Sequence, residues 1–286
     1  MMRAPRPPAT PPKAQSPKQP PAQAKPVPSS EGERLSKRVA AMVPCSRSQA
    51  EQTIEGGWVQ VDGRVIEEPQ FRVLRQTISI DPNATLLDSV PVTLLLHKPV
   101  DWLDGTDEAL ATLNRQARRG TVKNAHTLLT PSTRWPGDVD ATRVLQRHFK
   151  QQQACVPLET GASGLVVWTQ DWRVLRKLSE DLTFMENELI AEVRGEVTEQ
   201  ALRILNRELD ARGQPLPPTK VSVNSTSTSS SKLRFAIKGA HPGLVAYRCE
   251  QAQLELLALR RIRLGRVALS DLPVGQWRFL APGEKF

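Results

Sequence analysis

Residues 155–169 read CVPLETGASGLVVWT. The last part of this stretch, Leu165–Thr169, is an apolar run of the length of a buried strand. The loop in front of it, residues 156–164, carries one acidic side chain, Glu159. The glycines of this loop do not form a G-x-S-x-G nucleophile elbow, which argues against a serine hydrolase. The stretch therefore predicts one loop carboxylate directly before a core strand.

The sequence on both sides of this stretch predicts a domain of strands and helices over residues 92–286. Residues 254–259 fit either a strand or a helix, and 224–232 (NSTSTSSSK) fit a flexible loop or a solvated strand connection. Strands and helices occur without strict βαβ regularity, which favours an α+β fold with a mixed, largely antiparallel sheet. Strands are expected at Val92–Leu96, Leu189–Val193, Arg234–Ile237 and Arg261–Leu264, and helices at Ala141–Phe149, Arg173–Leu182 and Glu199–Leu209.

Residues 33–81 predict a separate mini-domain. Apolar spacing indicates helices at Glu33–Val43 and Arg47–Glu55, with Ser46 as the N-cap of the second helix and Gly56-Gly57 at its end. Short strands are expected at residues 58–61, 64–66 and 77–80, the first two joined by a tight turn at Asp62-Gly63. Residues 82–91 are predicted to be a linker.

Residues 1–32 form a basic, proline-rich tail. Its first 30 residues hold ten of the 24 prolines and five cations without any acid, so they carry +5 of the net charge of +9. Such a composition cannot bury a core. The tail is either a basic arm that attracts phosphate or a solubilising segment.

Composition limits the kinds of partner and site. A net charge of +9 and a pI of about 9.8 favour a polyanionic partner. The 3 cysteines and 4 histidines show no ligand spacing, so neither a zinc site nor a disulfide framework is indicated. No apolar run approaches the roughly 20 residues of a membrane span, and the N-terminus has no signal-peptide core. We expect a soluble cytoplasmic protein.

The mini-domain resembles the S4-type RNA-binding domain, or αL motif. The matching pattern is Arg34-Leu35-x-Lys37, Ser46-Arg47-x-x-Ala50 and Ile54-x-x-Gly57-x-Val59-x-Val61-x-Gly63. A pair of helices with cations on its surface can bind a phosphate backbone, and an open helix N-terminus can receive a phosphate. The RNA-binding candidates are Arg34, Lys37, Arg38, Ser46 and Arg47; the alternative is an amphipathic helix pair with ordinary surface cations.

The larger domain resembles the bacterial ribosomal RNA pseudouridine synthases of the RsuA/RluB/RluE/RluF group. Four segments carry the resemblance in order: LLHKP at 95–99, PLETGASGL at 157–165, NELIAEV at 187–193, and LRRIRLG at 259–265 followed by LPVGQWR at 272–278. With the mini-domain in front, the resemblance covers residues 33–281. It implies an isomerase that needs no metal or organic cofactor, acts on structured RNA and is a monomer by default.

The departures from the family pattern fall at the chemistry. Glu159 stands where the family has its catalytic Asp, Pro157 where it has an Arg, and Leu189 where it has a Tyr that stacks near the base. The segment His241-Pro242-Gly243-Leu244, with only Arg248 nearby, replaces a basic segment. The family reaction needs one carboxylate, acting on the sugar as nucleophile or base, and a flipped uridine. A displaced carboxylate can cost about 100-fold in rate, and a lost stacking ring roughly 1–3 kcal/mol per base.

Two functions compete on these residues. The first is an RNA-binding member of the family whose isomerisation is weak or lost, and the alternative is an active pseudouridine synthase with Glu159 as its catalytic carboxylate. A protein–protein adaptor that uses the proline-rich tail is a third class. Lys98 and Arg194 are further RNA-binding candidates that could anchor a phosphate or a carboxylate, or else ordinary surface charges. Trp168 and Trp172 either stack on bases or pack in the fold.

Overall fold

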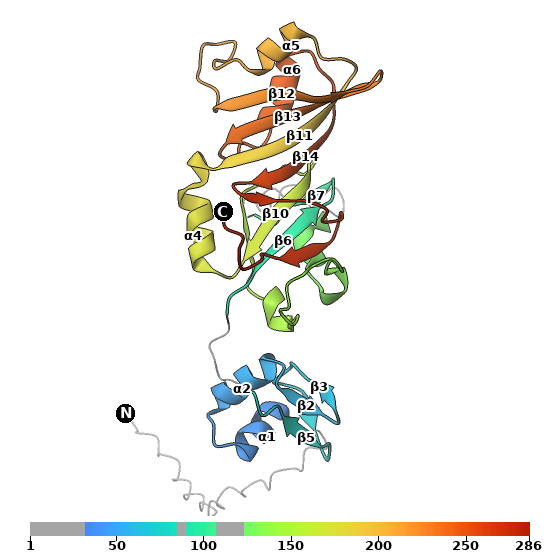
Figure 1. Ribbon diagram of the computed structural model, residues 1–286. Coiled ribbons are helices and arrows are strands. Elements are labelled where there is room, and N and C mark those ends of the chain that lie inside the picture. The colour runs from blue at the N-terminus through green and yellow to red at the C-terminus, as the bar shows by residue number, and fades with distance from the viewer. Residues whose placement is uncertain (1–31, 85–89, 107–122) are drawn as a thin grey trace, which may run out of the picture.

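The computed structural model describes residues 32–84, 90–106 and 123–286. These residues form two folded units, a smaller one from β1 to β5 and a larger one from β6 to β16, drawn at the bottom and the top of Figure 1. The strand β5 ends at Ile80 and β6 begins at Thr93. The basic tail, except Gly32, and residues 85–89 of the expected linker lie outside the described residues. Among the described residues, no helix is long and apolar enough to span a bilayer.

The smaller unit packs two helices on a small sheet, as predicted. The second helix occupies the predicted residues and begins with a capping box, in which the Ser46 hydroxyl accepts the Gln49 N–H at 3.2 Å and the Gln49 side chain accepts the Ser46 N–H at 2.8 Å. Both residues of the Asp62-Gly63 turn have positive φ, as a tight hairpin requires. The elements are β1 (Glu33–Arg34), α1 (Leu35–Met42), α2 (Arg47–Glu55), β2 (Val59–Val61), β3 (Arg64–Val65), β4 (Arg72–Val73) and β5 (Ile78–Ile80).

The larger unit is built on a nine-stranded sheet with the order β12-β13-β11-β14-β10-β6-β16, to which β9 and β15 add at the sides. Only β10 and β14 pair in parallel in this sheet, so the predicted mixed, largely antiparallel α+β fold is confirmed. The strands are β6 (Thr93–Lys98), β9 (Gln153–Cys155), β10 (Ser163–Thr169), β11 (Glu186–Arg194), β12 (Thr219–Thr226), β13 (Ser230–Lys238), β14 (Leu256–Leu264), β15 (Val267–Ala268) and β16 (Trp277–Phe279).

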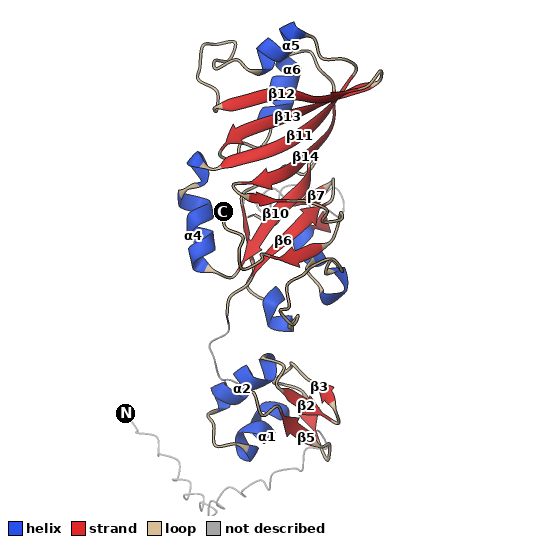
Figure 2. Cartoon of the chain, in the orientation of Figure 1, coloured by secondary structure: helices blue, strands red, loops and turns tan. Residues whose placement is uncertain are grey.

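Helices cover both faces of this sheet (Figure 2). The residues of β10 alternate between two cores, since Val166 and Trp168 join the larger cluster and Leu165 and Val167 join the second. The larger cluster includes α5 (Glu199–Leu205) and α6 (Leu244–Gln251), and the second includes α4 (Trp172–Glu180). Two layers of apolar side chains therefore fix the sheet that carries the Glu159 loop.

Several expected elements differ in the structure. Residues 256–259 begin one long strand, β14, and the Ser/Thr-rich stretch is the hairpin end of β12 and β13. The helix expected at Ala141–Phe149 is only a 3-10 turn at Gln146–Phe149, and α6 is a helix that the sequence did not predict. Tertiary packing decides these segments, because their own periodicity is short.

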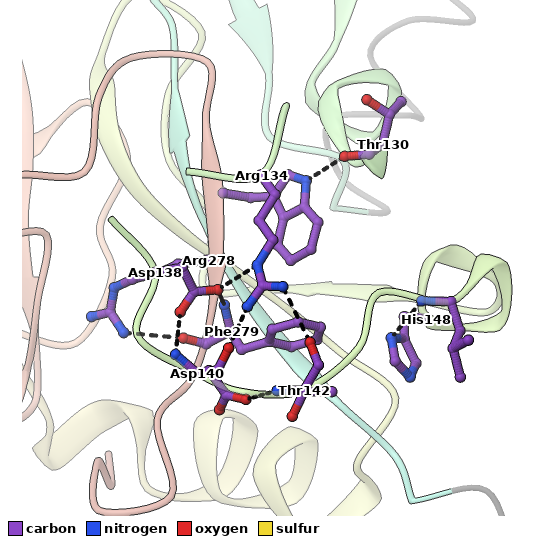
Figure 3. Close-up of polar contacts among 10 residues, drawn as sticks. Thr130, Arg134, Asp138, Asp140, Thr142, His148, Arg278 and Phe279 are labelled. Atoms are coloured by element: carbon purple, nitrogen blue, oxygen red, sulfur yellow. Dashed lines mark hydrogen bonds and ion pairs between the residues drawn. The ribbon is translucent and has the colours of Figure 1, made fainter. Parts of the chain in front are cut away.

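The segment before β9 follows an irregular path that one arginine organises. It contains β8 (Lys123–Asn124) and the 3-10 turns η1 (Ala125–Leu128), η2 (Pro131–Thr133) and η3 (Gln146–Phe149), and β8 pairs with β7 (Trp102–Leu103). Arg134 donates to the Asp138 carboxylate at 3.0 Å and to the carbonyls of Asp140 and Thr142 at 2.6 and 3.1 Å (Figure 3). Its guanidinium also lies over the ring of Phe279 in β16, 5.1 Å from the centroid.

A glycine is required where β10 meets β14. Gly164 has a φ of +119°, and a Cβ there would lie 2.3 Å from the carbonyl oxygen of Arg261. The two strands pair at this position, Gly164 opposite Arg261. The sheet therefore admits no side chain at residue 164.

We expect Gly164→Ala to lower the free energy of unfolding by about 3 kcal/mol, because the new methyl group collides with backbone and the φ is unfavourable for alanine. Gly161→Ala is the matched control in the same loop, since nothing lies within 4 Å of a Cβ at that position. Urea unfolding of both variants measures the difference. Equal stabilities would contradict the close approach.

Candidate functional site

Glu159 lies in the loop between β9 and β10, at the end of β10 that pairs with β14. Its side chain is partly buried, and its carbonyl oxygen accepts the Ala162 N–H at 3.0 Å, which closes the turn into β10. Among the described residues, its carboxylate has no ion-pair partner within 4.0 Å. The loop thus presents a carboxylate that is not consumed by a structural salt bridge.

Arg261 binds the backbone of the first part of this loop. It lies in β14, and its side chain is fully buried. The guanidinium donates from Nη1 to the Val156 carbonyl at 3.0 Å and from Nη2 to the Pro157 carbonyl at 2.5 Å. Val156 has a φ of 60°, which is unusual for a β-branched residue and more so before a proline. The two hydrogen bonds to Arg261 therefore stabilise a strained turn.

Lys98 holds the last part of the loop. Its side chain is fully buried, and its ammonium donates to the carbonyls of Pro99, Trp102 and Thr160 at 3.1, 2.8 and 3.1 Å. All three ammonium protons are therefore used inside the protein. This placement does not fit the expected phosphate anchor, nor the alternative of a surface charge. The sequence could not show that the strand ends with its lysine turned under the loop.

Asp104 holds the middle of the loop. It is buried, and its Oδ2 accepts the Leu158 N–H at 2.6 Å, while its Oδ1 accepts the backbone N–H and the hydroxyl of Thr106 at 2.9 and 2.8 Å. Together with Arg261 and Lys98, it fixes the backbone on both sides of Glu159. We call these three buried charged residues the loop clamp.

The loop clamp and Glu159 interact electrostatically. Burial lowers the pKa of Arg261 to about 10, although the negative charges of Glu159 and Asp104 oppose that shift. Burial also lowers the pKa of Lys98 to about 8, against the carboxylates of Asp104, Glu159 and Asp101. Both cations are charged at neutral pH and both act on Glu159. The arrangement can therefore place one carboxylate, beside two buried cations, against a bound sugar as nucleophile or base.

Leu189, which stands where the resembled family has a Tyr, is an aliphatic core residue in the structure. Leu189 lies in β11 opposite Arg261 of β14 and Phe235 of β13, and only 4% of it is exposed. Leucine has no ring for a base to stack on. Trp168 does not replace such a ring, because it is buried in the larger core and packs against His126. Trp172 is 61% exposed on α4, where Arg173 lies over its ring.

The remaining predicted residues of the larger unit lie away from this loop. Arg194 is the last residue of β11, five positions beyond Leu189, and it binds Glu255 through two hydrogen bonds of 2.5 and 2.9 Å. Arg248 is buried in α6 and donates to the carbonyls of Leu205, Arg207 and Pro217. The structure therefore does not bring Arg194 together with Glu159, and Arg248 is used within the fold.

The cations of the smaller unit are exposed on and before its two helices. Lys37 and Arg38 of α1 pair with Glu33 at 3.0 and 3.7 Å, and Arg47 of α2 pairs with Glu51 at 3.1 Å. Exposed pairs of this kind contribute little, so they leave the cations available to a phosphate. Arg34 precedes α1 and is also exposed. The Ser46 hydroxyl caps α2, so it serves the helix itself.

Sequence reasoning did not assign a role to Arg261 or Asp104. Both lie in or near segments that carry the family resemblance, since Arg261 lies in LRRIRLG and Asp104 follows the Lys98-Pro99 pair. Alternation along β14 could have indicated Arg261, because Leu259 and Arg261 share a face and Leu259 is a core residue. No pattern along the chain indicates that Asp104 meets a loop 54 positions away.

Comparisons with known proteins find relatives of both units. The S4 domain family matches residues 33–78. The chain is 26% identical over 259 residues to a ribosomal large subunit pseudouridine synthase B of Bacillus subtilis (strain 168), which covers 88% of this chain and 93% of the relative. It is 25% identical over 253 residues to the dual-specificity RNA pseudouridine synthase RluF of Escherichia coli (strain K12), covering 88% and 76%.

One solved structure has the same fold. The crystal structure of a pseudouridylate synthase superposes with a TM-score of 0.51 at 17% identity and covers 87% of this chain and 96% of that one. The first unit is thus an S4 domain and the second has a pseudouridine synthase fold. Along most of its length the chain is similar to RsuA-type pseudouridine synthases, with an S4 domain in front of a domain of the synthase fold.

We expect the buried Lys98 to give the fold a specific pH dependence. Its pKa is about 8 in the folded protein and ordinarily 10.5, so between these pH values the unfolded chain binds a proton that the folded chain has lost. The free energy of unfolding therefore rises with pH in this range, by up to about 3 kcal/mol relative to Lys98→Met. Urea unfolding from pH 7 to 10.5 measures it, with the exposed Lys220→Met as control. Parallel profiles of the wild type and Lys98→Met would contradict the burial.

Proposed function

We propose that the chain binds structured RNA, and ribosomal RNA in particular, through its S4 domain and the surface around the Glu159 loop. The observation that carries this proposal is the S4 domain, whose helices α1 and α2 expose Lys37, Arg38 and Arg47 on one small unit, with Arg34 beside them. Cations of this kind bind phosphates without reading sequence. The Bacillus subtilis relative is a ribosomal large subunit pseudouridine synthase, which supports ribosomal RNA as the partner.

We further propose that isomerisation of uridine to pseudouridine, the reaction named for the relatives, is weak or absent in this chain. Glu159 is one methylene longer than the Asp of the resembled family, and misplacement by about 1 Å can cost about 100-fold. The aliphatic Leu189 removes a stacking contact of roughly 1–3 kcal/mol per base. Pro157 offers only its carbonyl, which binds Arg261.

The alternative is an active synthase with Glu159 as its catalytic carboxylate, and the loop clamp favours it. Burying Lys98, Asp104 and Arg261 is costly unless they are paired and hydrogen-bonded. All three side chains form hydrogen bonds to the backbone around one partly exposed carboxylate. Arg261 also supplies the cationic neighbour that the sequence had suggested was lost with Pro157.

The partner and the compartment follow from the same proposal. We propose that the protein works in the cytoplasm, where it would meet ribosomal RNA, and no membrane partner is needed for that role. We propose that it acts as a monomer, because one S4 domain and one synthase domain supply all the residues of the site. Phosphates bound by Lys37, Arg38 and Arg47 have to displace only surface carboxylates.

We expect purified protein to bind a ribosomal RNA fragment with an affinity that falls steeply as salt is raised. Arg47→Ala should weaken binding several-fold and reduce the slope of log affinity against log salt by about 1, because one phosphate contact is lost. Fluorescence anisotropy at several salt concentrations measures both. Arg212→Ala, an exposed arginine outside the S4 domain, is the matched control. Equal loss in both variants would contradict a specific role for α2.

We expect carbodiimide mapping of ribosomal RNA to show no uridine whose modification depends on this protein, because the carboxylate is displaced and the stacking ring is absent. The comparison is between cells with and without the gene, complemented by wild type or by Glu159→Gln. A carbodiimide stop that disappears on deletion and returns only with the wild-type gene would establish the active alternative. RNA binding by Glu159→Gln serves as the control for folding.

A further inference from the structure

One segment of the synthase domain reaches the S4 domain. Arg143 donates to the Gly57 carbonyl at 3.2 Å, the Gln146 N–H donates to the Glu67 carboxylate at 2.6 Å, and Lys150 lies 3.6 Å from the Glu55 carboxylate. These contacts meet the end of α2 and the loop after β3. They therefore join the segment to two separate parts of the S4 domain.

An apolar contact lies among these polar ones. Leu145 is only 6% exposed, and its Cδ2 lies 2.9 Å from the position that a Cβ of Gly57 would take. Gly57 has a φ of +71° because it ends α2, so its missing side chain also leaves room for Leu145. The S4 domain thus offers a shallow site that fits one leucine.

The same segment is fixed to the synthase domain at both of its ends. At its start, Asp138 binds Arg134 and accepts the Phe279 N–H of β16 at 3.2 Å (Figure 3). At its end, the Gln170 side chain donates to the carbonyls of Arg147 and Lys150 at 2.8 and 2.6 Å. We call residues 134–150 the bracket, since they are anchored on one domain and contact the other.

We propose that the bracket docks the S4 domain onto the synthase domain, so that the two domains move as one body. Interfaces between domains of one chain usually permit relative motion unless they are large and apolar. This interface is small, and a polar cavity of about 490 Å³ lined by Gln52, Glu55, Arg147 and Lys150 remains beside it. A short covalent connection compensates, because it holds the domains at an effective concentration on the order of 1 mM, so a weak contact is enough to keep them together.

Docking has a consequence that rests on the proposed function. With the bracket in place, the cations of α1 and α2 and the Glu159 loop lie at a fixed separation, so an RNA that fits both binds without first ordering the domains. Because three of the contacts involve charged side chains, the docking weakens as salt is raised.

The test is the tumbling of each domain in the full chain, measured by ¹⁵N NMR relaxation without RNA. We expect S4 and synthase amides of the wild type to share one rotational correlation time. In Leu145→Asp, which places a carboxylate against Gly57, the S4 amides should tumble roughly twofold faster than the synthase amides, as expected of a unit of about 50 residues on a tether. Arg212→Ala, in the loop between α5 and β12, is the control and should tumble as the wild type does.

Two results would overturn the docking: independent tumbling of the wild-type S4 domain, or a shared correlation time in Leu145→Asp. Dispersed amide spectra show whether Leu145→Asp is folded. If it is not, the double variant Arg143→Ala, Glu67→Ala removes two polar contacts without touching a buried side chain, and the same two outcomes decide. Because no RNA is present, failure here is distinct from failure of RNA binding, which the anisotropy titration measures separately.

Discussion

The guanidinium of Arg261 is the constraint on which the site depends. A fully buried cation is tolerated only where hydrogen-bond acceptors and negative charge surround it, and here the carbonyls of Val156 and Pro157 and the charges of Glu159 and Asp104 meet that need. The backbone of the same residue lies against Gly164, so a glycine is required on the neighbouring strand. One arginine thus links the geometry of β14, the first residues of β10 and the loop between them.

The Glu159 site combines a loop held by three buried charged residues with an aliphatic residue at position 189. Lys98, Asp104 and Arg261 fix the loop as tightly as a catalytic carboxylate requires, because preorganised groups lose nothing in reorganisation. Leu189, however, which stands where the resembled family has a Tyr, is aliphatic and part of the core. The loop clamp favours catalysis, whereas the aliphatic Leu189 favours RNA binding alone. We give more weight to Leu189, because a flipped uridine has to be held before a carboxylate can act on it.

The sequence predicted the local structure well and the buried charges poorly. The limits of α2, its cap at Ser46 and the Asp62-Gly63 turn depend on interactions within a few residues, and all are confirmed. Lys98 was expected to anchor a phosphate or a carboxylate, or else to be a surface charge, but it is fully buried. Its partner Trp102 is four positions away along the chain, whereas Thr160 becomes a neighbour only when β6 and β10 pair. The unpredicted helix α6 and the 3-10 turn η3 depend likewise on contacts between distant segments.

The most direct measurement of this account is the free energy of unfolding of Arg261→Gln beside that of Arg260→Gln. The two arginines are neighbours in β14, one fully buried under the Glu159 loop and the other exposed. We predict a loss of about 3–5 kcal/mol for Arg261→Gln, because it removes one of the two buried cations beside Asp104 and leaves the strained turn without its guanidinium donors, and a change within about 0.5 kcal/mol for Arg260→Gln. Equal, small losses in both variants would contradict it.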